Sequence, residues 1–261
     1  MIMKTTKYML AGLIMSTMLL PAVASAEDTA SYNTNGAVTF TANTDPTKPV
    51  DPLDPENPIT PTDPTDPTKP DPGTAGPLSI DFASSLQFGE QKITSTTQVY
   101  SAQAQKYTTK NGVATEGPNY AQITDNRGTE TGWTLKVKQN GQFSNPEGKE
   151  LTGAKITLNN GNVVTNSSSA SPTGNSSIVL TPASTDPESE NYGAESIVMS
   201  AQNGQGAGTY LYAWGSDQAS AADSIKLEVP GSTTKYATQY TTTFTWTLSD
   251  IPTNTETPEN P

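Results

Sequence analysis

The stretch that decides the fold is Tyr240-Thr-Thr-Thr-Phe-Thr-Trp-Thr-Leu-Ser-Asp-Ile-Pro252, close to the end of the 261-residue chain. Apolar residues alternate there with threonine, and this period of two is typical of a β-strand with one buried face. We predict a strand over 236–248 whose inner face carries Tyr240, Phe244, Trp246 and Leu248.

A second Trp-Thr-Leu triplet lies upstream, in Arg127-Gly-Thr-Glu-Thr-Gly-Trp-Thr-Leu-Lys-Val137. Trp133, Leu135 and Val137 share one face of the predicted strand, and Lys136 lies on the other. This alternation follows the apolar-in, polar-out rule of a half-buried antiparallel sheet.

The surrounding 175 residues contain further short alternating stretches separated by Asn-Gly turn signals, and no segment has a helical period. The sequence therefore predicts an all-β fold, a single antiparallel β-sandwich domain over 78–252. Besides the two motif strands, over 132–139 and 236–248, we predict strands at 78–82, 154–159, 177–181, 196–201, 208–214 and 224–229.

Three segments precede the domain. Residues 1–26 have the charged start, apolar core and Ala24-Ser25-Ala26 site of a cleaved secretory signal peptide. Residues 27–43 form a short polar segment with one strand-like stretch, Ala37 to Thr41. Residues 44–77 carry proline at every third position from Pro46 to Pro70, which predicts an extended, disordered linker that does not pack on the domain.

A proline-rich run of this kind is either a semi-rigid spacer or a ligand for a proline-recognising domain, and we favour the spacer. Residues 253–261 are predicted to be a loose tail without an LPxTG-type sorting motif. We therefore expect surface retention to be non-covalent, with no transmembrane segment in the mature chain.

Charge and composition exclude several classes of function. Without the two lysines of the signal, 12 basic and 26 acidic residues remain, so a nucleic-acid partner is not expected. The acidic chain would also be repelled by anionic wall polymers, so wall binding requires a specific pocket or groove. The chain has no cysteine and no histidine, which excludes Cys and Ser-His nucleophiles and His- or Cys-based zinc sites. We expect no cofactor.

The paired Trp-Thr-Leu motifs resemble those of the WxL domain family. The first motif follows an Arg-Gly, the second follows a Tyr-Thr-rich stretch near the C-terminus, and the opening Leu78 to Gly89 and the stretch Leu151 to Leu158 add further similarity. The resemblance extends over nearly the full chain. It implies a secreted surface protein of Gram-positive bacteria that binds the cell wall non-covalently, through peptidoglycan or another wall glycan. It also implies other WxL proteins and a membrane-anchored protein as partners.

The resemblance places the wall-binding function on the two motifs and on the single arginine. Tryptophan rings stack on sugars, and an arginine can hold a stem-peptide carboxylate in a two-pronged grip. The alternative is that the motif residues are core residues of two neighbouring strands. We expect a core position for Trp246 and a more open position, near Arg127, for Trp133. The predicted wall-binding residues are Trp133, Thr134, Leu135, Trp246, Thr247, Leu248 and Arg127.

Several alternatives stay open at this point. Tyr210, Tyr212 and Trp214 form either a second sugar surface or part of the core. Acidic residues at 186, 188 and 190 suggest calcium but lack an EF-hand pattern, so we predict a solvated loop and no metal site. We predict a wall-binding module and no enzyme. The alternatives are an adhesin retained by a partner protein and a glycosidase using two carboxylates.

Overall fold

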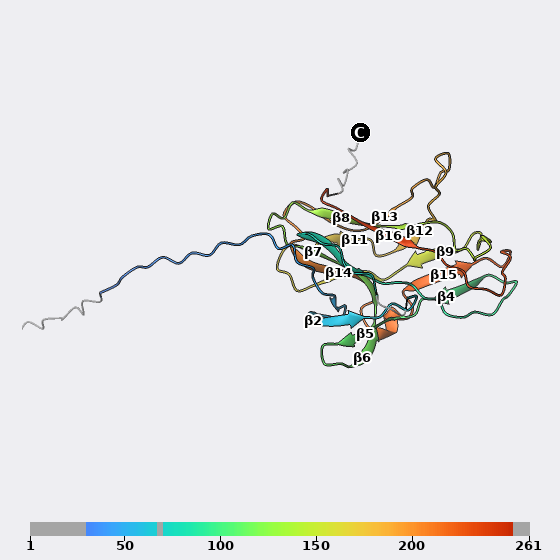
Figure 1. Ribbon diagram of the computed structural model, residues 1–261, viewed down its shortest axis with the longest axis horizontal. Helices are drawn as coiled ribbons and strands as arrows, with labels where there is room; N and C mark the ends of the chain where they lie inside the picture. Colours follow the sequence, from blue (N-terminus) through green and yellow to red (C-terminus); the bar gives the residue numbers. More distant parts are fainter. Residues whose placement is uncertain (1–29, 67–69, 253–261) are drawn as a thin grey trace, which may run out of the picture. The chain divides into compact units, whose positions relative to one another are not determined.

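The computed structural model describes residues 30–66 and 70–252 (Figure 1). Chain contacts divide the protein into residues 1–39 and residues 40–261, and each unit is described by itself. In the first unit, residues 30–39 form no helix or strand. The predicted signal peptide and C-terminal tail lie outside the described residues.

In the second unit, the regular elements of the described residues are strands with a single short helix, as the predicted all-β fold requires. All of its paired strands are antiparallel and belong to four four-stranded sheets. The described residues include one short helix, α1 (Gln218–Ala221), which Asp217 caps by accepting a hydrogen bond from the Ser220 backbone N–H at 2.7 Å.

The central sheet has the strand order β10-β14-β7-β3. Its strands are β3 (Leu78–Ala83), β7 (Asn119–Asp125), β10 (Gly161–Thr165) and β14 (Gly208–Trp214). Every side chain of β7 is buried, which explains why the sequence did not predict this strand. A strand covered on both faces loses the apolar–polar alternation that marks a half-buried one.

The motif sheet has the order β11-β13-β8-β16 and contains both Trp-Thr-Leu triplets. Its strands are β8 (Trp133–Gln139), β11 (Thr173–Gly174), β13 (Ser196–Ala201) and β16 (Phe244–Ser249). The prediction of one strand over 236–248 is therefore wrong for its first half, because β16 begins only at Phe244. Chain pairing there is limited to a single bridge between Thr241 and Ser144, so most of that half has no strand partner.

A third group, the side sheet, has the order β12-β9-β15-β4. Its strands are β4 (Gln98–Ser101), β9 (Lys155–Leu158), β12 (Ile178–Leu180) and β15 (Ile225–Val229). Three of these four strands match predicted ones. The exception is β4, a short polar edge strand whose sequence carries no clear pattern.

The fourth sheet, here the proline-segment sheet, has the order β1-β2-β5-β6 and corrects the predicted linker. Its strands are β1 (Val50–Asp51), β2 (Asp54–Pro61), β5 (Gln105–Thr109) and β6 (Ala114–Gly117). Residues 50–61, predicted to be a disordered linker that does not pack, instead pair with β5 through Ile59, Thr60 and Pro61. Polyproline and β backbones are both extended, and the non-proline residues supply the N–H groups that pairing needs.

Side chains of β14 alternate between two cores on the two faces of the central sheet. Tyr210, Tyr212 and Trp214 enter the larger core, which they share with the motif and side sheets. Leu211 and Ala213 enter a smaller core that contains Ile59 of the proline-rich residues 44–77, here the proline segment. The predicted sandwich is thus present, and the proline-segment sheet adds a third layer. The aromatic side chains of β14 are core residues and not a sugar surface.

Candidate functional site

The first motif is buried. The Trp133 side chain has no exposed surface, and its Nε1–H donates a hydrogen bond to the Gly206 carbonyl oxygen at 3.0 Å. Its ring lies 6.1 Å from the ring of Tyr210 on the central sheet. Gly206 has a φ of +82°, and a Cβ there would lie 2.6 Å from the Trp133 ring, so only glycine fits. The expectation that Trp133 would be the more open of the two tryptophans is wrong.

The second motif lies directly beside the first, on the edge strand β16. Leu248 is opposite Leu135, and Trp246 is opposite Val137. Residues opposite each other in an antiparallel pair point to the same face, so both triplets contribute to one inner surface. Trp246 is partly buried, and its ring lies 6.1 Å from that of Trp214.

The threonines of the two motifs differ in their surroundings. Thr134 is buried, and its hydroxyl donates to the carbonyl oxygen of Ile251 at 2.9 Å, which fixes the chain just beyond β16. Thr247 is exposed on the outer face of the same sheet. The first motif therefore holds the C-terminal end of the domain in place, and Thr247 is the exposed residue of the two motifs.

Arg127 is already engaged within the chain. Its Nε and Nη2 atoms donate to the two carboxylate oxygens of Asp125 at 2.9 and 2.8 Å, and Nη2 also donates to the Gly132 carbonyl oxygen at 2.7 Å. The Asp125 side chain is 1% exposed. The hydrogen bond to Asp125 raises the pKa of the guanidinium. The arginine thus closes the loop that leads into Trp133.

The acidic loop suggested for calcium is exposed. Asp186 accepts a hydrogen bond from the Glu188 backbone N–H at 3.0 Å, as in an ordinary turn. Over residues 30–66 and 70–252, no cluster of three or more acidic, histidine or cysteine side chains could hold a metal ion.

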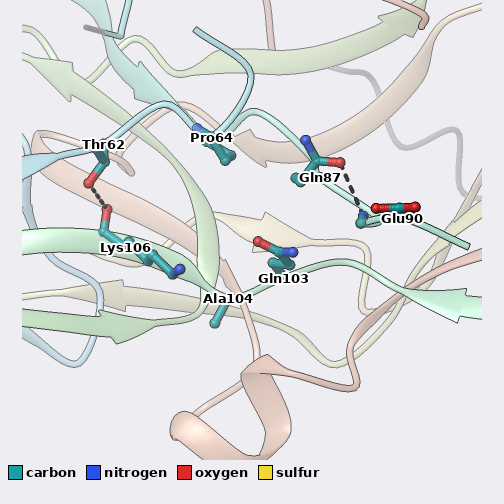
Figure 2. Close-up of a pocket in the computed structure, with 8 residues that line it drawn as sticks. Thr62, Pro64, Gln87, Glu90, Gln103, Ala104 and Lys106 are labelled. Atoms are coloured by element: carbon teal, nitrogen blue, oxygen red, sulfur yellow. Dashed lines mark hydrogen bonds between the residues drawn. The ribbon is translucent and has the colours of Figure 1, made fainter. Parts of the chain in front are cut away.

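A polar cleft of about 440 Å³ is lined by residues that belong to neither motif. Figure 2 shows Thr62 and Lys106 on one side, Gln87 and Glu90 on the other, and Gln103 between them. Pro64, Gly89 and Ala104 complete the lining. Neither Lys106 nor Glu90 belongs to an ion pair among the residues that the structure describes. The cleft offers amides, a hydroxyl and one charge of each sign.

Hydrogen bonds tie the walls of this cleft together. The Thr62 hydroxyl donates to the Lys106 carbonyl oxygen at 3.1 Å, and the Gln105 side chain donates to the Thr62 carbonyl oxygen at 2.7 Å. The Gln103 backbone N–H donates to the Gln87 carbonyl oxygen at 2.8 Å. The cleft is therefore preformed, and one wall belongs to the proline segment. Its residues come from three separate chain segments, so no sequence motif indicates it.

Comparison with known proteins identifies one family. The chain matches the WxL domain, described as a surface cell wall-binding domain, over residues 27–252. The match starts well before Leu78 and includes the proline segment. No curated protein and no solved structure matches the chain. Among the described residues, no helix is long and apolar enough to cross a membrane.

Proposed function

The chain belongs to the WxL family of surface cell wall-binding domains, and on that premise we propose that it attaches non-covalently to peptidoglycan. Membership of the family implies a location at the cell surface or cell wall. We propose an attachment role without a catalytic step. Action within a surface complex with other WxL proteins and a membrane-anchored protein stays a prediction.

The polar cleft is our candidate for the site that takes the wall polymer. A chain with a formal net charge of -12 needs a specific groove, because its overall field repels anionic polymers. Peptidoglycan offers hydroxyl and amide groups on its glycan, and carboxylates and amines on its stem peptides. The amides of Gln87 and Gln103 match the first set, and Lys106 and Glu90 match the second.

The two motifs support attachment in this proposal by building the domain. Trp133, Leu135 and Thr134 are buried, and Trp246 and Leu248 face the same core. A sugar ring cannot stack on the Trp133 ring, because other side chains cover it completely, and Trp246 exposes only part of its side chain at the sheet edge. Arg127 also supports the fold in this proposal and does not bind the ligand, because its guanidinium is paired with Asp125.

Sedimentation with purified wall sacculi tests this proposal. The chain from Glu27 onward should bind the sacculi, and a chaotrope should release it without enzymatic digestion. Gln103→Ala and Lys106→Ala should each weaken binding, by about fivefold for the neutral hydrogen bond of Gln103 and by about tenfold for the charged one of Lys106. Their circular dichroism and melting temperature should stay as in the wild type.

Lys149→Ala is the matched control, because Lys149 is an exposed lysine that does not line the cleft. It should bind walls as the wild type does. Full binding by both cleft variants would refute the cleft as the site. Failure of the folded wild type to bind any wall preparation would refute direct attachment.

A further inference from the structure

The segment before the proline-segment sheet contains a strand sequence without a partner. Every side chain from Ala30 to Pro46 is exposed, with Val38 76% and Phe40 88% exposed. No hydrogen bond between backbone groups joins residues 30–43 to another described residue. Ala37-Val38-Thr39-Phe40-Thr41 alternates β-branched and aromatic residues in the way that favours a strand. An isolated strand leaves both its apolar face and its backbone groups in water.

This segment belongs to the same family module as the sandwich. The family match begins at residue 27 and thus includes it. Residues 30–44 carry no charge at all, in a chain where 15% of residues are charged. An uncharged segment can approach a strongly acidic domain without the repulsion that acidic segments of the chain would meet.

The motif sheet presents an edge on which such a strand fits. β16 is its last strand and pairs only with β8, so half of its backbone N–H and C=O groups point away from the sheet. On this side the larger core is incompletely covered, because Phe244, Trp246 and Leu248 are only partly buried. A small apolar hollow lies between Leu86, which follows β3, and the rings of Phe244 and Trp246.

The two sequences have the same pattern. β16 carries Phe244-Thr-Trp-Thr-Leu248, apolar residues inward and threonines outward. The unpartnered segment carries Val38-Thr-Phe-Thr41, which alternates in the same way. Paired beside β16, Val38 and Phe40 would cover the exposed side of Trp246 and Leu248, and the threonines would face solvent.

We propose that residues 37–41 of one copy add as a fifth strand to the free edge of β16 in a second copy. Each copy then has both a donor strand and an acceptor edge. Such a head-to-tail contact leaves a free donor strand and a free acceptor edge at the two ends, so further copies can add until a ring closes or a row forms. The proposal is independent of peptidoglycan binding, since the cleft residues take no part in it.

Cysteine cross-linking of the mature chain tests the contact, because the chain has no cysteine of its own. Thr39→Cys and Thr247→Cys lie on the outer faces of the two strands and are opposite each other when Val38 and Phe40 cover Trp246 and Leu248. A mixture of the two single variants should form the disulfide-linked heterodimer under oxidation. Thr39→Cys mixed with Thr115→Cys, on the remote strand β6, is the control and should not. Equal cross-linking in both mixtures, or none in either, would overturn the proposal.

Light scattering of the same chain measures assembly directly. The wild type should shift from monomer to multiples of the monomer mass as its concentration rises, and Phe40→Asp should stay monomeric. Val113→Asp replaces another exposed apolar residue and should assemble normally. A wild type that is monomeric at every concentration refutes the proposal. So does a double variant, Thr39→Cys with Thr247→Cys, that cross-links only within a monomer, because the segment would then occupy its own edge.

Discussion

The packing of the proline segment gives the sharpest prediction about stability. Ile59 on β2 is 6% exposed and lies in the smaller core with Tyr120 and Leu211 of the central sheet. Ile59→Ala removes a buried side chain and leaves a cavity, which costs ~2–5 kcal/mol. For a domain of this size, that loss lowers the melting temperature by roughly 4–20 °C.

Thermal unfolding followed by circular dichroism measures this change, and urea unfolding gives the free energy at room temperature. Leu53→Ala is the control on the same segment, since Leu53 is 41% exposed and should change stability by less than about 0.5 kcal/mol. An Ile59→Ala variant that melts like the wild type would show that the proline segment is a detached linker after all. The same logic predicts a large loss for Gln122→Ala, because that buried amide accepts from Val50 N–H and donates to the Lys48 carbonyl oxygen.

Three further perturbations test the roles of single residues. Trp133→Ala should lower the free energy of unfolding by ~3–5 kcal/mol and lose wall binding only in proportion to unfolding. A melting curve measured beside the sacculus assay checks this. Normal melting with lost binding would contradict a core role. Arg127→Lys keeps the charge but loses the two-pronged bond to Asp125, so it should cost about 1–3 kcal/mol in urea unfolding while the folded variant binds walls normally. Burial raises the pKa of Asp81 above its ordinary value of 3.8, although hydrogen bonds from Thr124, Gln122 and Ser79 lower it. Because the folded pKa is the higher one, the Asp81 contribution to stability is present at low pH and is lost as pH rises through the folded pKa. Urea unfolding across the acidic range should show this loss in the wild type and not in Asp81→Asn, and parallel pH profiles would contradict the assignment.

The sequence by itself determined the fold class and the family. Alternation of apolar residues with polar ones is a local property, so it predicted seven of the eight proposed strands closely and the apolar faces of both motifs. The same local signal failed for β7, because its polar side chains Gln122 and Thr124 are buried in a hydrogen-bond network with Asp81. It failed for β2 because a proline period of three indicates a polyproline spacer. The local sequence does not show that β5 lies beside this segment and pairs with it.

Only the tertiary structure decided which surfaces remain open. The sequence predicted a core position for Trp246 and an open one for Trp133, whereas Trp133 is fully buried against Gly206 and Tyr210, and Trp246 is partly exposed at a sheet edge. Arg127 was a candidate for ligand binding until its pairing with the buried Asp125 was known. The polar cleft joins residues 62, 87 and 103, which no local pattern connects. The burial of a side chain and the lining of a cleft depend on which segments, distant in the sequence, pack together. The alternation within one strand shows which of its side chains face inward, but not which other segments cover them.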